Sequence, residues 1–94
     1  MSGSADTPSP EDLAEALRQI EIGPFLVSTV ATLASLVHGK IEQGELAQAK
    51  AGIDAIAALV PVVSGEIDAG VARDLERNLT ILRLAYADAV TAAL

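Results

Sequence analysis

The sequence contains no cysteine and no tryptophan, and Phe25 and Tyr86 are its only phenylalanine and tyrosine. The lack of cysteine excludes disulfides, thiolate metal sites and cysteine nucleophiles. Because large aromatic side chains are so few, a core has to be built from Ala, Val, Leu and Ile. These side chains bury little area each, so many close helix contacts are required. The 94 residues are the size of one domain, and half of them are hydrophobic.

Basic residues are also scarce. Lys and Arg number 6 against 13 Asp and Glu, which gives a net charge of −7. Nucleic-acid binding requires clustered basic side chains that displace counterions from phosphates, and the scattered Lys and Arg of this chain argue against it. The same balance argues against anionic lipid surfaces and favours solubility or a basic partner.

The chain has a single histidine, His38, and no group of residues that indicates catalysis. His38 precedes Gly39 at the expected end of a helix, where an imidazole can interact with the last carbonyl groups. A catalytic base needs a positioned partner, and the nearest acids, Glu42 and Glu45, are expected to lie in solvent. No pair of histidines one turn apart is available for a metal. We therefore predict no catalytic residue, no metal site and no cofactor.

The most informative feature that is present is an uncharged stretch, residues 22–39. A helix that is apolar all round must be buried all round, and so short a chain has little protein with which to surround it. Self-association into a dimer or tetramer would bury this helix. The alternative is a membrane, since 18 residues is the lower edge of spanning length. Flanking basic residues and Trp or Tyr anchors, which favour a membrane span, are missing.

Two helices are predicted in the first half of the chain. Ser9 can cap the first helix, and Pro10 suits its first position. This helix has a short amphipathic stripe and should end before Pro24. A helix of about ten residues is marginally stable alone, so we expect it to pack against another part of the protein. Pro24 also opens the apolar helix, which should end at His38 with Gly39 as its C-cap and residues 40–44 as a polar turn.

Two further helices are predicted in the second half. The third helix starts at Glu45 and carries one apolar stripe, and Pro61 should kink or end it. The last helix starts at Asp68 as N-cap and follows a heptad pattern to the C-terminus. The predicted fold is all-α, an antiparallel helical hairpin or bundle of three to four helices with a long C-terminal helix. Residues 1–9 are expected to be a disordered tail and residues 10–94 a single domain.

The large apolar positions of these helices are expected to form the core and the interface between copies. They are Phe25, Leu26, Val30, Leu33, Val37, Ile53, Ile56, Leu75, Leu79, Leu82 and Tyr86. Ile81 and Leu84 lie off the heptad stripe. With Arg83 they suggest a second contact face for an unknown protein partner.

Three segments together resemble a known family. They are the apolar stretch from Phe25 to Gly39, the run Leu-Ala-Gln-Ala-Lys-Ala-Gly-Ile-Asp at 46–54 and the run Leu-Thr-Ile-Leu-Arg-Leu-Ala-Tyr at 79–86. In order and spacing, residues 25–90 are similar to the small bacterial family named domain of unknown function 1844. The chain departs from that family in its short segment at 40–44. The resemblance implies a helical bacterial protein without an assigned activity, and it supplies no catalytic residue.

The sequence therefore predicts an interaction or scaffold protein that self-associates and binds a partner, and not an enzyme. The N-terminus lacks the basic region and apolar run of a signal peptide, so we expect the cytoplasm. Two alternatives stay open. One is a membrane-associated protein that uses residues 22–39, and the other is a small-ligand protein with a pocket between its helices.

Overall fold

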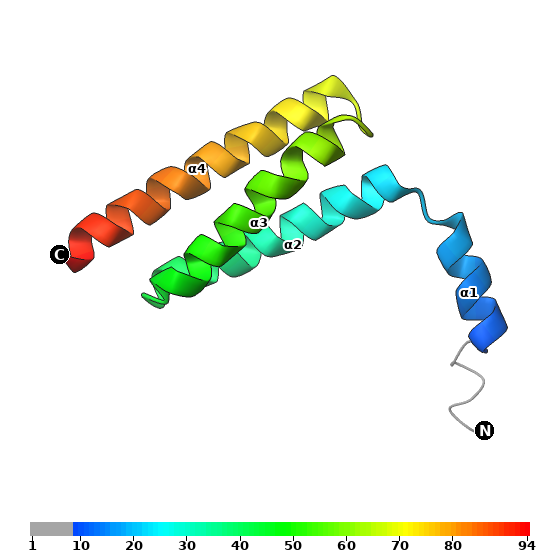
Figure 1. Ribbon diagram of the computed structural model, residues 1–94, viewed down its shortest axis with the longest axis horizontal. Coiled ribbons are helices and arrows are strands. Elements are labelled where there is room, and N and C mark those ends of the chain that lie inside the picture. The colour runs from blue at the N-terminus through cyan, green and yellow to red at the C-terminus, as the bar shows by residue number, and fades with distance from the viewer. Residues whose placement is uncertain (1–8) are drawn as a thin grey trace.

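The computed structural model describes residues 9–94, which form four α-helices (Figure 1). In chain order they are α1 (Pro10–Gln19), α2 (Ile22–Glu42), α3 (Leu46–Ser64) and α4 (Ala69–Ala93). No strand occurs within the described residues. The all-α prediction is therefore confirmed. Except for Ser9, the tail expected at residues 1–9 lies outside the described residues.

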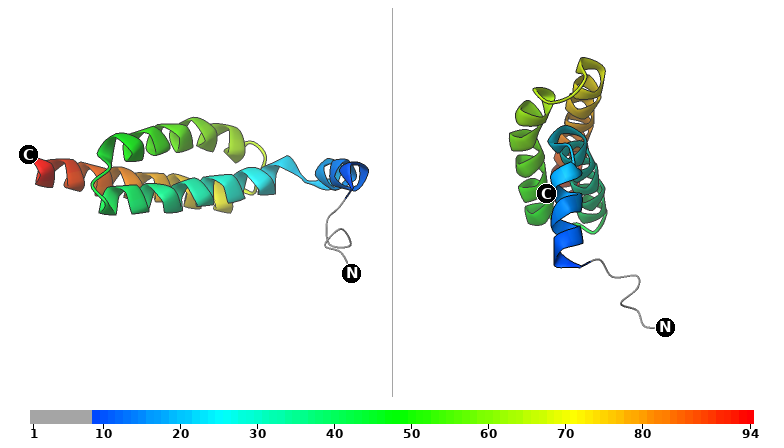
Figure 2. Two further views of the ribbon diagram at one scale, coloured as in Figure 1. Left: turned by 90° about the horizontal axis from the view of Figure 1, so that it is seen from below. Right: turned by 90° about the vertical axis from the view of Figure 1, so that its right-hand side faces the viewer.

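Helices α2, α3 and α4 form an antiparallel bundle joined by short loops at residues 43–45 and 65–68. The two views of Figure 2 show α3 running alongside α2 and α4, on one side of both. One core runs through the three helices, and it has no buried polar or charged residue in the described part of the chain. Its buried members are Val30, Val37, Ala49, Ile53, Ile56, Val60, Val63, Leu75, Leu79 and Leu82.

Helix α1 packs against none of the other three helices and stands away from the bundle (Figure 1). The radius of gyration is 17.3 Å, whereas a compact domain of this length has about 12 Å. The prediction that α1 docks is therefore wrong within a single chain. Extended backbone at Ile20 and Glu21 holds the two helix axes at an open angle.

The boundary between α2 and α3 differs from the prediction. Helix α2 does not end at His38 but continues through Gly39 to Glu42. The helix stops at Gly44, whose φ of +77° is the left-handed conformation that glycine adopts without steric cost. The amide of Gly44 donates to the carbonyl of Ile41 at 3.0 Å, and that of Glu45 to the carbonyl of Lys40 at 2.9 Å. This pair of bonds is a Schellman cap, which a glycine inside the helix cannot supply.

Helix α3 does not end at Pro61 either; it continues to Ser64. Pro61 lies in the last turn with its ring exposed, so it removes one backbone hydrogen bond near the helix end and does not disrupt the core. Both predicted N-caps are confirmed. The Ser9 hydroxyl accepts from the Asp12 amide at 3.1 Å, and the Asp68 carboxylate accepts from the Gly70 amide at 2.9 Å.

Candidate assembly surfaces

Most of the predicted core and interface residues are covered within one chain. Seven of them, two from α2, two from α3 and three from α4, are buried, and Leu26, Leu33 and Tyr86 are partly buried against them. Phe25 is the exception, because 52% of its surface is exposed. The apolar helix is therefore covered on one side by its own chain, and only its other side is left for an external partner.

The uncovered side of α2 forms a continuous uncharged surface. We call it the outer face of α2, made of the exposed residues Phe25, Ser28, Thr32, Ser35 and Leu36. The first four recur three or four positions apart, and Leu36 lies one turn after Thr32. The Thr32 hydroxyl donates to the Ser28 carbonyl at 3.0 Å, so it is satisfied within the helix. Small side chains between a phenylalanine and a leucine leave a surface on which another helix can approach closely.

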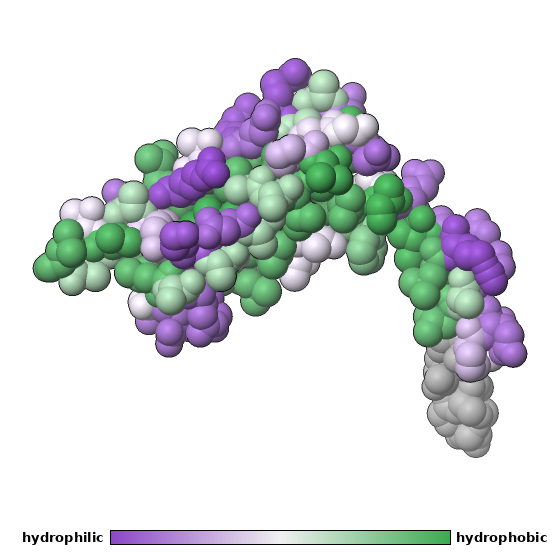
Figure 3. All heavy atoms as spheres, viewed as in Figure 1, coloured by the Kyte–Doolittle hydropathy of each residue, from purple (hydrophilic) through white to green (hydrophobic). Residues whose placement is uncertain are grey.

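A second apolar surface lies at the junction of α1 and α2. We call it the elbow, made of Leu13 and Leu17 from α1, its C-cap residue Ile20, and Ile22 and Phe25 from α2. Every one of these side chains is between 48% and 60% exposed. Four of them, all except Leu13, line an open notch of about 190 Å³. Figure 3 shows the hydrophobic side of α1 turned toward the inner angle with α2 and its hydrophilic side turned outward.

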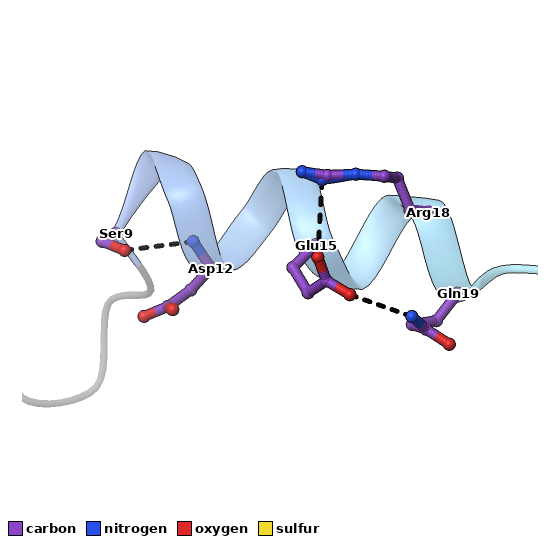
Figure 4. Close-up of polar contacts among 5 residues, drawn as sticks. All are labelled: Ser9, Asp12, Glu15, Arg18 and Gln19. Atoms are coloured by element: carbon purple, nitrogen blue, oxygen red, sulfur yellow. Dashed lines mark hydrogen bonds and ion pairs between the residues drawn. The ribbon is translucent and has the colours of Figure 1, made fainter.

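The polar side of α1 makes its hydrogen bonds within the helix (Figure 4). Glu15 accepts from Arg18 at 3.4 Å and from Gln19 at 2.9 Å. With Ser9 capping the first turn, these contacts favour the helix but add only a few tenths of a kcal/mol each at the surface. They leave the apolar stripe as the part of α1 without a partner in the chain.

The three residues predicted to form a partner face on α4 do not all lie on one side of the helix. Ile81 and Leu84 are exposed by 48% and 62%. At 100° per residue, however, Arg83 lies about 160° around the helix from Ile81. The arginine one turn from Ile81 is Arg77, whose guanidinium contacts Asp74 at 3.3 Å. Ile81 and Leu84 therefore share a face without Arg83.

The described residues show no arrangement for chemistry. No group of three His, Asp or Glu in residues 9–94 could hold a metal ion. His38 is exposed, and Lys40 takes the place in the last turn of α2 that was expected for it. The hydrogen bond and charge of Asp54, 2.8 Å away, raise the pKa of Lys50 above its ordinary value, but both groups lie in solvent.

Two further concavities are open to solvent. One, of about 190 Å³, lies between α2 and α3 and is lined by Leu33, Leu36, Val37, Lys40, Gln48 and Gly52. The other, of about 390 Å³, lies beside the α2–α3 loop and the end of α4. Ligand sites are usually enclosed, whereas both of these concavities are open to solvent.

Two helices, Ile22–Glu42 and Leu46–Ser64, are long and apolar enough to cross a membrane. Length and composition alone are weak evidence, because a core helix of a soluble protein has the same properties. In the most apolar 18-residue window of each helix, 17% is buried in α2 and 28% in α3, so each helix keeps an exposed side.

No family model, no curated protein and no solved structure matches the chain.

Proposed function

We propose that the chain acts by self-association, as a scaffold or interaction protein without catalysis. The observation that supports this proposal is the outer face of α2, an exposed surface that carries no charge on a chain of net charge −7. The elbow adjoins this face at Phe25 and adds exposed apolar side chains, and contiguous exposed apolar surface on a soluble protein commonly marks an interaction site. The resemblance to domain of unknown function 1844 assigns no activity, and it is compatible with this role.

A lipid bilayer is the second candidate occupant, favoured by the length of α2 and α3. The packing of α4 argues against it. Helix α4 carries Arg73, Arg77 and Arg83, as well as acids, and it packs along α3. Insertion of α2 and α3 would either pull these charges into hydrocarbon or strip α4 from the core, and both are costly.

The solution mass of the full chain in detergent-free buffer tests the proposal. We expect a dimer or tetramer by light scattering after size exclusion. A monomer that sediments with vesicles would contradict the proposal and support the membrane alternative. A monomer that does not bind vesicles would contradict both.

A pair of threonine variants tests the surface. Thr32→Asp places a charge on the outer face of α2 and should disperse the assembly without unfolding the bundle, since Thr32 is exposed within one chain. Thr80→Asp is the matched control on α4. Thr80 is also exposed, and its hydroxyl likewise donates to the carbonyl four residues back, at 3.1 Å. If both variants keep the mass of the parent chain, the outer face of α2 is not the interface.

A further inference from the structure

Helix α1 is formed but has nothing to pack against. It has ten residues, and isolated helices of that length are marginal in water. None of its residues is buried, although Leu13, Leu17 and Ile20 form a stripe with the spacing of a packed helix face. A helix with this pattern is stabilised by an apolar surface that covers the stripe.

The surface that fits this stripe is the outer face of α2. The stripe offers large side chains at intervals of three and four residues, and the outer face offers small ones, Ser28, Thr32 and Ser35, at the same intervals. Large side chains of one helix then enter the spaces between small side chains of the other, as in knobs-into-holes packing. The stripe runs over eight residues, from Leu13 to Ile20, or about 10 Å, and fits within the length of the outer face.

The link between α1 and α2 turns α1 away from the line of α2, so the stripe adjoins the outer face of its own chain only at Phe25. Ile20 has φ −74° and ψ 127°, and Glu21 has φ −79° and ψ 134°, both extended. A two-residue extended link does not reverse the chain. Ile20, being β-branched, resists the positive φ that a tight reversal commonly uses. A second copy of the chain can place its outer face in the elbow without any change in this link.

Charge does not oppose a second copy at these surfaces. The acids of α1, Glu11, Asp12 and Glu15, lie outside the stripe, and the outer face of α2 has no charge. Two copies of an acidic chain can therefore meet on these surfaces without bringing acids together, which would otherwise repel.

The area available is at the lower limit for a specific dimer. Leu13, Leu17, Ile20, Ile22, Phe25 and Leu36 are each about half exposed, and each offers roughly 80 Å² of apolar surface. Two copies would remove about 1,000 Å² from water through these side chains alone. The small residues of the outer face add to this area, and the total reaches the lower range of specific interfaces, about 1,200 Å².

We propose that α1 is an exchange arm, which docks its stripe of Leu13, Leu17 and Ile20 on the outer face of α2 of a second copy of this chain. The exchange is reciprocal, so that each copy both gives an arm and receives one. This inference rests on the proposed self-association and names the element that completes the interface.

Leu17→Glu tests the arm, with Gln19→Glu as its matched control. Both changes add one negative charge to α1, and Gln19 lies on the polar side beside Glu15. We expect Leu17→Glu to raise the dimer dissociation constant by about 30-fold or more, since it buries a charge at the centre of the interface. Gln19→Glu should change it little. Sedimentation equilibrium measures both.

If the parent chain self-associates and the Leu17→Glu variant associates equally well, the exchange-arm proposal is wrong, whereas the proposed self-association is supported. If the parent chain is a monomer at high concentration, as the Thr32→Asp variant is expected to be, the proposed self-association is wrong. The exchange-arm proposal, which rests on it, is then wrong too.

Hydrogen exchange separates a second copy from the other possible occupants. The amides of α1 should be protected at concentrations where the chain is a dimer and unprotected on dilution to the monomer. Protection at every concentration would mean that α1 folds back on its own chain, and protection only with added vesicles would mean that lipid covers it. Either result would overturn the exchange arm.

Discussion

Individual glycines set how closely the helices of the bundle approach. A Cβ atom added at Gly52 of α3 would meet Cγ2 of Val37, which is buried in α2. A Cβ atom added at Gly23 would lie 2.6 Å from the carbonyl oxygen of Glu66. At Gly39, by contrast, nothing lies within 4 Å of the added atom. Residues of the same type inside helices therefore have opposite roles, one permitting contact and the other weakening a helix.

Gly52→Ala and Gly39→Ala should change stability in opposite directions. Alanine at position 39 should stabilise the protein by about 0.5–1 kcal/mol, because it removes the entropic cost of a glycine inside α2. Alanine at position 52 gains the same helix propensity but forces the stiff Val37 side chain away, and should destabilise by about 1–2 kcal/mol net. Urea unfolding at one protein concentration measures both. Equal effects of the two changes would show that the α2–α3 contact is not tight at Gly52.

At the scale of the element, the ends of helices depend on local hydrogen bonds more than on residue type. Ser9 and Asp68 cap their helices as their side chains predict. Gly39 and Pro61 carry the residue types that usually end helices, yet α2 and α3 run through them. The Schellman cap at Gly44 and the core contacts of Val60 and Val63 outweigh these local preferences.

Pro61→Ala should stabilise α3, because an amide at position 61 can bond the carbonyl of Ala57. We expect a gain of about 1–2 kcal/mol, less than the full cost of a proline inside a helix since the unfolded chain also gains freedom. Ala58→Pro, another exposed position of the same helix, should cost about 3 kcal/mol. Thermal melts followed by circular dichroism compare the two. A loss of stability in Pro61→Ala would mean that the proline ring contributes packing.

At the scale of the whole molecule, charge and apolar surface are separated. The chain has net charge −7, but the elbow and the outer face of α2 are uncharged. Two copies approaching each other therefore experience a general repulsion and a local apolar attraction. Salt screens the electrostatic repulsion but not the apolar attraction.

Sodium chloride should therefore strengthen self-association. Between about 20 mM and 200 mM salt we expect the dissociation constant to fall several-fold, because screening weakens the repulsion between two acidic copies. Sedimentation equilibrium at the two salt concentrations checks this. Weaker association at the higher concentration would instead indicate an interface held by ion pairs, such as arginines of one copy against acids of the other.

The existence of the four helices and most of the core residues could be predicted from local patterns in the chain. Caps and apolar spacing are local properties, so Ser9, Asp68 and the stripes of α3 and α4 could be read without a structure. Which side of α2 is covered depends on how the helices pack, because an apolar helix without a polar face has no pattern that orients it. Nor do local patterns predict that α1 stands away from the bundle. That outcome depends on the backbone angles of Ile20 and Glu21, which composition and periodicity do not specify.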